Sequence, residues 1–266
     1  MKKSGQECPL YLPDARTLQT LSEERLLIAL AQEQARRRKY NYIRTLYPED
    51  GPLSRHNYPK HMAFFRAGAV HNERAFLAAN RIGKTEGVGG FELTLHATGV
   101  YPRWWEGRRF DRPIKAWAAG DTNQTVRDII QAKLLGPVDD KGSGLIPKDL
   151  IHRTRPKQGM PDGVEIIYVQ HVPTGGISRI GLKSYEAGRK SFQGTEQDII
   201  WLDEEPPLSI YAECLIRTMT TEGMLLCTFT PLEGMTDVCM LYLKDGKIPE
   251  GGVAVNESTL IQVEAA

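Results

Sequence analysis

The chain lacks a hydrophobic run long enough to cross a lipid bilayer, and its N-terminus does not follow the basic, apolar and small-residue order of a secretion signal. It also lacks an excess of charge, because 34 lysines and arginines stand against 33 aspartates and glutamates. We therefore expect a protein that works in the cytoplasm and not in a membrane. The balanced charge argues against a protein that coats nucleic acid, so any such contact must come from local basic patches.

Cysteine is scarce, with four in 266 residues. Cys8, Cys214, Cys227 and Cys239 show no C-x-x-C spacing and no neighbouring pair of histidines, which argues against a structural zinc site. Cys227 lies in an apolar run, and Cys214 lies in a segment with helical periodicity. We therefore expect reduced thiols in the core and a reducing compartment.

One segment, RAFLAANRIGKTEGV at residues 74–88, is strongly patterned. An apolar run leads into a tight stretch and then into helix-compatible sequence. A phosphate-binding loop needs this order, because a buried strand delivers the chain, the turn points backbone N–H groups at the phosphates, and the helix offers its positive end. The candidate binding residues are Ala78, Ala79, Asn80, Arg81, Ile82, Gly83, Lys84, Thr85 and Glu86.

Two residues of this loop have specific expected roles. Lys84 would contact the β- and γ-phosphates of a nucleotide, and the Thr85 hydroxyl would bind Mg²⁺. The first position of the usual G-x-x-x-x-G-K-[ST] pattern is Ala78 instead of glycine. Because a bare G-K-[ST] also occurs by chance in ordinary surface turns, the loop alone leaves that alternative open.

A second segment, DIIWLDEE at residues 198–205, runs from apolar residues directly into acid. A continuous apolar run suits a strand buried on both faces of a parallel sheet, and the ligand crevice of such a sheet lies at the carboxyl ends of its strands. Asp203 is therefore expected to bind Mg²⁺, and Glu204 to activate the attacking water. The alternative is a solvated acidic turn. Glu205 is expected to be a bystander, because two prolines follow it.

The order of the segments predicts an α/β domain with an N-terminal arm. Residues 1–57 are expected to form a leader, a helix over residues 23–39 and a linker, and residues 58–266 to form the main domain. Helices alternate with short apolar strands, which favours a mostly parallel sheet covered on both faces. Further strands are expected at residues 114–119, 164–169, 177–182 and 224–229, and helices at 86–95, 208–220 and in a segment ending at Gly136.

Aromatic side chains gather just ahead of the first expected strand, in YPKHMAFFRAG at residues 58–68. Tyr58, His61, Phe64 and Phe65 have faces that stack well on a nucleotide base, so one interpretation is an adenine pocket. Their helical spacing suits packing in the core equally well, and the sequence does not decide between the two.

Three ordered strings, FLAANRIGKTEG, SYEAGRKSFQGTEQDIIWLDEEPP and LLCTFTPLEG, together resemble the ATPase domain of the large terminase subunit of tailed bacteriophages, over roughly residues 58–234. The resemblance implies a P-loop NTPase fold of the ASCE type, with ATP and Mg²⁺ as cofactors. It also implies a motor that moves double-stranded DNA into a procapsid in the host cytoplasm. Implied partners are the portal protein, the small terminase subunit and other copies in a ring on the portal. We expect a monomer in isolation and no place in the mature virion.

The resemblance assigns further roles. Thr230 would sense the γ-phosphate from the strand end at residues 228–231, with an ordinary strand terminus as the alternative. Many relatives carry arginine at the position of Asn80, whereas here the arginine is Arg81, which would have to bend towards the phosphate. A second cation is expected from a neighbouring subunit; Arg189 is the candidate and Arg179 its competitor.

Other features leave alternatives open. Large terminases normally carry a C-terminal nuclease, and the 35 residues after Pro231 are too few for a domain of typical size, so we expect no DNA cleavage by this chain, whether truncated or naturally short. A helicase- or recombinase-type ATPase and a nucleotide-binding docking module without turnover are the rival functions. Candidate DNA contacts, unless they only form a solvated loop, are Arg103, Arg108, Arg109 and Arg112.

Overall fold

The computed structural model describes residues 23–231, 236–243 and 253–255. The expected leader, Cys8 and most of the C-terminal tail lie outside these residues. By its internal contacts the chain divides into one unit that ends at Lys39 and a second that begins at Tyr40. The sequence predicts a boundary at residue 58 instead. The difference arises because Ile43 and Tyr47, in the expected N-terminal arm, are buried in the hydrophobic core of the second unit.

The first unit contains the expected helix, α2 (Glu23–Tyr40), whose last residue begins the second unit. Basic residues occupy its last turn, where they complement the helix dipole. Glu33 pairs with Arg36 and Arg37 on neighbouring turns. Within the described part of the chain, neither α2 nor any other helix combines the length and apolar character needed to cross a membrane.

The second unit is built on one sheet of eight strands in the order β3-β4-β5-β2-β6-β7-β1-β8. The neighbours from β5 through β2, β6 and β7 to β1 pair in parallel, whereas β3–β4, β4–β5 and β1–β8 pair antiparallel. The strands are β1 (Glu73–Leu77), β2 (Lys115–Gly120), β3 (Ile151–Pro156), β4 (Val164–Gln170), β5 (Ile177–Ser184), β6 (Ile199–Asp203), β7 (Met224–Phe229) and β8 (Val253–Val255). The mostly parallel α/β sheet is as predicted.

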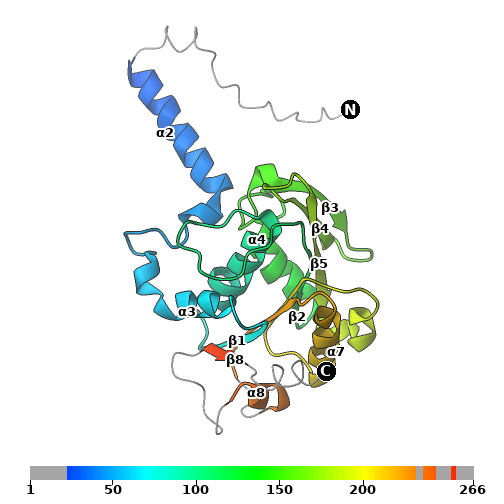
Figure 1. The fold of residues 1–266 in the computed structure, drawn as a ribbon. Helices are drawn as coiled ribbons and strands as arrows, with labels where there is room; N and C mark the ends of the chain where they lie inside the picture. Colours follow the sequence, from blue (N-terminus) through cyan, green and yellow to red (C-terminus); the bar gives the residue numbers. More distant parts are fainter. Residues whose placement is uncertain (1–22, 232–235, 244–252, 256–266) are drawn as a thin grey trace, which may run out of the picture. The chain divides into compact units, whose positions relative to one another are not determined.

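Helices cover both faces of this sheet, and α4 and α7 lie on opposite sides of it (Figure 1). Alternate residues of the central strands divide between the two layers: Trp201 joins the first core, and Ile200 and Leu202 join the second. The first layer contains α3 (Pro59–Ala67), η3 (Lys84–Gly90), α4 (Phe91–Thr98), α5 (Asn123–Thr125), η4 (Val126–Gln131) and α6 (Ala132–Leu135). The second contains η7 (Arg189–Phe192), α7 (Leu208–Met219) and α8 (Asp237–Leu241).

The helix after β1 is not one regular α-helix. The sequence predicts a helix over residues 86–95, whereas a π-helical segment, η3, occupies Lys84–Gly90 and α4 follows it. Gly89 of η3 lies so close to Trp201 of β6 that a Cβ atom there would stand 2.1 Å from the indole nitrogen. The absence of a side chain at position 89 therefore lets this helix pack directly on the neighbouring strand.

Strand β3 was not predicted from the sequence. Its residues, IHRTRP, show no alternation of apolar and polar positions, and all of them are exposed or only partly buried. It pairs with β4 alone, at the edge of the sheet, where polar side chains and a terminal proline are tolerated. The expected strands at residues 164–169 and 177–182 form the neighbouring antiparallel pair, β4 and β5.

Candidate nucleotide-binding site

The loop between β1 and η3 has the backbone shape of a phosphate-binding loop. Arg81 and Gly83 both have positive φ values, 66° and 87°, and Gly83 caps the N-terminus of η3. Glycine adopts this left-handed conformation at no steric cost. The turn therefore directs the chain into a helix whose N-terminal N–H groups remain available to an anion.

The Lys84 side chain is buried beneath this loop. Its Nζ donates to the Ala79 carbonyl oxygen at 3.0 Å, to Asn80 Oδ1 at 3.4 Å and to Thr230 Oγ1 at 2.6 Å. Thr230 Oγ1 also lies 2.9 Å from both the Ala78 carbonyl oxygen and Asn80 Oδ1. The predicted lysine and the predicted sensor threonine are thus brought into direct contact at one end of the sheet.

The predicted magnesium ligands also meet, although β7 separates the strand of the loop from the strand of the carboxylate. Thr85 Oγ1 lies 3.0 Å from each carboxylate oxygen of Asp203, at the end of β6. Thr228 on β7 donates to Asp203 Oδ1 at 2.8 Å and accepts from Trp201 Nε1 at 2.8 Å. One strand between the phosphate loop and the acidic strand is the arrangement of an ASCE-type P-loop fold.

The chemistry of this pair fits a magnesium ion. Asp203 is only 5% exposed, and this burial raises the pKa of its carboxyl group to about 7, with the charge of Glu204 acting in the same direction. Hydrogen bonds from Thr228 and Thr85, and the charge of Lys84, oppose that rise. A buried carboxylate beside a hydroxyl is a hard oxygen donor set, which Mg²⁺ prefers. A divalent cation would also favour the ionised carboxylate that burial disfavours.

Glu204 has a backbone conformation that non-glycine residues rarely adopt. Its φ is 65°, and this left-handed region costs such a residue about 1–2 kcal/mol. The main chain turns sharply as β6 ends, and the exposed Glu204 side chain lines a cleft of about 540 Å³ together with Asp121, Glu205 and Thr230. Strain of this kind persists only where the surroundings impose it, and it is common at functional sites.

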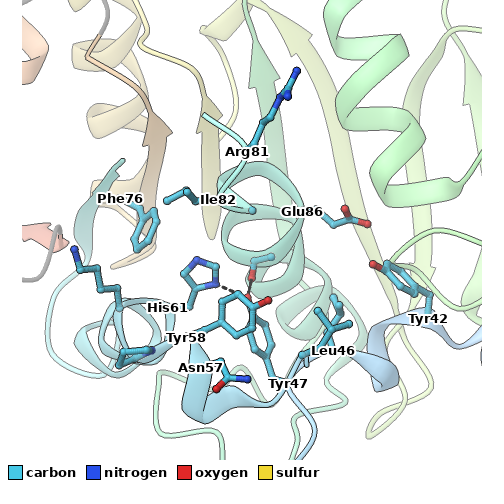
Figure 2. A pocket seen from close by; sticks show the side chains of 15 residues that line it. Tyr42, Leu46, Tyr47, Asn57, Tyr58, His61, Phe76, Arg81, Ile82 and Glu86 are labelled. Carbon is cyan, nitrogen blue, oxygen red and sulfur yellow. Dashed lines mark hydrogen bonds between the residues drawn. The ribbon is translucent and has the colours of Figure 1, made fainter. Parts of the chain in front are cut away.

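A second cavity, of about 670 Å³, opens beside the phosphate loop (Figure 2). The predicted Tyr58 and His61 line it, together with Ile82, Gly83 and Glu86. Phe65 does not: its ring is buried 5.0 Å from that of Trp105 and 5.5 Å from that of Phe91. Phe64 is fully buried as well. For these two residues, core packing is the interpretation that the structure supports.

Two lining residues of this cavity, Tyr42 and Tyr47, were missed because they fall in the expected N-terminal arm of residues 1–57. The signal that could have found them is the density of tyrosine there, since a solvated linker rarely carries several aromatic residues. Tyr47 donates to the Gly87 carbonyl oxygen at 2.7 Å, and its hydroxyl lies 2.6 Å from His61 Nδ1. Figure 2 shows this contact below the helix, with Arg81 extending away from the aromatic side chains.

The candidate second cation, Arg189, is bonded within its own chain. Its Nε donates to Glu213 Oε2 at 3.0 Å, while about half of the side chain stays exposed. Glu213 on α7 also pairs with Arg217, which lies one turn further along the helix. Arg179 lies elsewhere, on β5, with its guanidinium 5.7 Å from the Tyr168 ring centroid.

A family model described as "Terminase large subunit, T4likevirus-type, N-terminal" matches residues 75–253, more than half of the chain. The chain belongs to this family. The large terminase subunit of Salmonella phage P22 is 37% identical over 207 residues, which cover 71% of this chain and 41% of that protein. The chain therefore spans less than half the length of this terminase relative.

Solved terminase structures have lower sequence identity to this chain. The ATPase domain of the Thermus phage P74-26 large terminase, an arginine-to-alanine mutant, is 19% identical, with a TM-score of 0.48 over 72% of this chain and 74% of that one. The large terminase of a thermophilic bacteriophage in complex with ADP is 15% identical, with a TM-score of 0.43 over 64% of this chain and 37% of that one.

Replacing His61 with glutamine should make folding less sensitive to acid. Burial lowers the pKa of His61 to about 4 from an ordinary value of 6.5, and a hydrogen bond to the Ile82 main chain opposes this only in part. The unfolded chain therefore takes up a proton before the folded one does as the pH falls, and the wild type loses stability between these two values. Melting temperatures near pH 7.5 and near pH 5 measure the loss.

The wild type should show a larger fall in melting temperature than His61→Gln over this range. His152→Gln, at an exposed position in β3, serves as the control and should follow the wild type. An equal fall in the wild type and in His61→Gln would contradict this prediction.

Proposed function

We propose that this terminase domain binds ATP with Mg²⁺ and hydrolyses it, and that hydrolysis drives double-stranded DNA into a procapsid. The observation that carries the proposal is the contact between Thr85 and Asp203. These two oxygen donors come from separate sequence segments and meet at 3.0 Å, beside the buried Lys84. A nucleotide-binding site needs this combination of a cation, a hydroxyl and a carboxylate.

In the proposed reaction, the ATP phosphates lie against the loop of residues 78–85. Lys84 would exchange its present oxygen partners for phosphate oxygens and neutralise charge that develops on the γ-phosphate. Mg²⁺, held by Thr85 and Asp203, would supply further positive charge at the phosphates. Glu204 would accept a proton from the attacking water, and Thr230, which contacts Lys84, would report the presence of the γ-phosphate.

The base of the nucleotide is proposed to enter the cavity of Figure 2. Tyr58 and His61 offer ring faces there, and Glu86 follows the loop directly. Arg81 has an exposed side chain that extends away from these rings, so we propose that it acts at the phosphates and not at the base.

The remaining partners are proposed from the family. The chain would act in the host cytoplasm as one subunit of a ring on the portal protein, with DNA delivered by the small terminase subunit. In such a ring, we propose that Arg189 reaches the active site of a neighbouring subunit. Its exposed position at the start of η7 supports this, because an arginine supplied in trans stabilises charge on the transferring phosphoryl group.

Glu204→Gln should slow ATP turnover severely while leaving nucleotide binding intact. Loss of a general base lowers kcat by about 10²-fold or more, because water is then a poor nucleophile. The measurement is phosphate release with Mg²⁺, with and without double-stranded DNA. Glu205→Gln is the matched control, because this carboxylate lines the same cleft but contacts Thr236.

Normal turnover in Glu204→Gln would contradict the proposed base. Nucleotide binding without any turnover by the wild type, even when assembled on DNA and portal, would favour a docking module. Turnover stimulated equally by single- and double-stranded nucleic acid would favour a helicase-type ATPase.

The DNA contact is proposed to lie on the open sheet face at β3, β4 and β5. Arg153, Tyr168 and Arg179 stand opposite one another across these three strands. Both guanidiniums lie over the tyrosine ring, at 3.6 and 5.7 Å from its centroid, and neither makes a hydrogen bond or ion pair with another described residue. Their donors therefore remain available to phosphates.

Three of the four predicted arginines in the loop at residues 101–113 are less suited to this contact, whereas Arg103 is exposed and stays a candidate. Arg108 bonds to Asn72 and to the Glu222 carbonyl oxygen, Arg109 bonds to the Trp105 carbonyl oxygen, and Arg112 bonds to Asp198.

Replacing Arg153 and Arg179 together with glutamine should weaken DNA binding equally for all sequences. Each phosphate contact contributes about 0.9 to the slope of log K against log salt, so the slope should become shallower by about 1.8. Titration of a DNA duplex at several salt concentrations measures it. Arg66→Gln, which removes an exposed arginine paired with Glu106, should keep the wild-type slope. An unchanged slope in the double variant would exclude this surface.

Arg189→Ala should abolish hydrolysis by the assembled ring and leave nucleotide affinity unchanged. The reason is that a cation supplied in trans acts only on the neighbour's transition state. Phosphate release by the portal-bound assembly is the measurement, and Lys190→Ala, at the adjacent exposed position, is the control. Normal turnover of the Arg189→Ala assembly would overturn the assignment.

A further inference from the structure

Tyr185 follows the last residue of β5 and is the first residue of η6 (Tyr185–Ala187). Its ring is buried, and its hydroxyl reaches the point where β6 ends. The hydroxyl oxygen lies 3.1 Å from the main-chain carbonyl oxygens of both Asp203 and Glu204, and 3.4 Å from that of Ala119. The single phenolic proton is therefore shared mainly between the main-chain carbonyl oxygens of Asp203 and Glu204.

These contacts act on the residue whose backbone is strained. The Glu204 N–H donates to the Thr228 carbonyl oxygen at 2.9 Å, and the Glu204 carbonyl oxygen accepts from Tyr185. Both main-chain polar groups of Glu204 are thus held, one by β7 and the other by the segment after β5. With its φ at 65°, the residue leaves the line of the strand, and its side chain faces the cleft that contains Thr230.

The turn that carries Tyr185 is itself anchored. The Glu186 N–H donates to the Asp121 carbonyl oxygen at 3.1 Å, and Glu186 Oε1 accepts from the Asn123 N–H at 2.7 Å. Both partners lie just beyond the end of β2, so the turn is fixed to a strand adjacent to β6. A hydroxyl mounted on a fixed turn can determine the position of the group that it binds.

We propose that Tyr185 is a positioning residue for Glu204: its hydroxyl holds the left-handed backbone that aims the Glu204 carboxylate at the water beside the γ-phosphate. The inference rests on the proposed function of Glu204. It adds a residue that contacts neither nucleotide nor metal ligand side chain and acts only through the main chain.

The hydroxyl, and not the ring, carries this role. Burial raises the pKa of Tyr185 well above its ordinary value. The phenol therefore keeps its proton, and remains a hydrogen-bond donor, at neutral pH. Phenylalanine keeps the ring and its packing against Phe192 and removes only the donor. Tyr185→Phe is therefore a small change with a specific expected consequence.

Tyr185→Phe should lower kcat by about tenfold or more, because a catalytic group displaced by less than an ångström loses much of its effect. KM for ATP and the affinity for ADP should stay within about twofold of the wild type. The matched control is Tyr211→Phe. Its hydroxyl is also buried, but it contacts Glu73 at the opposite end of β1 from the phosphate loop. This control should keep the wild-type kcat.

A second measurement separates positioning from a general effect on folding. Single-turnover rates are compared for Glu204→Gln with and without Tyr185→Phe. If Tyr185 acts through the carboxylate, the added change should have no further effect in this background. An equal loss of kcat in both backgrounds, or a kcat in Tyr185→Phe alone that matches the Tyr211→Phe control, would overturn the inference.

The two proposals fail in different ways. If Glu204→Gln turns over normally, the proposed function of Glu204 is wrong, whatever Tyr185→Phe does. If Glu204→Gln is inactive and Tyr185→Phe is fully active, only the positioning role is wrong.

Discussion

The organisation of this domain depends on one buried carboxylate. Asp203 receives hydrogen bonds from Thr85, at the start of the helix after β1, and from Thr228, on the strand between. Removing a carboxylate from water is costly unless hydrogen bonds compensate. The helix η3 and the strands β6 and β7 must therefore keep their relative positions for Asp203 to stay buried. Burial disfavours the ionised form of Asp203, and the divalent cation that we propose for this site would favour it.

The parts of the site that the sequence predicts are those set by short, contiguous patterns. The phosphate loop needs a glycine next to Lys84, and the acidic strand needs an apolar run ending in Asp203. Both patterns can therefore be recognised from the sequence alone. Of the aromatic residues predicted for the cavity, Tyr58 and His61 line it and Phe65 does not. His61 and Phe65 lie one helical turn apart, yet Phe65 is buried against Trp105, a contact between segments that no local pattern contains.

Other features are invisible in the sequence for a related reason. The π-helical form of η3 and the left-handed turn at Glu204 arise from packing against neighbouring strands, not from the preferences of their own residues. Strand β3 exists because β4 offers it a pairing edge. Tyr47, in a segment with the composition of a linker, becomes buried through its contact with Gly87. In each case tertiary contacts override local propensity.

The close approach of Gly89 to Trp201 has a consequence for how such a sequence can change. There is no space at position 89 for even a methyl group while the indole occupies position 201, because the gap would be 2.1 Å. A larger residue at position 89 therefore requires a smaller one at position 201, whereas a smaller residue at position 201 would meet no clash with Gly89. Positions 89 and 201, more than a hundred residues apart in the chain, are therefore coupled by one steric contact.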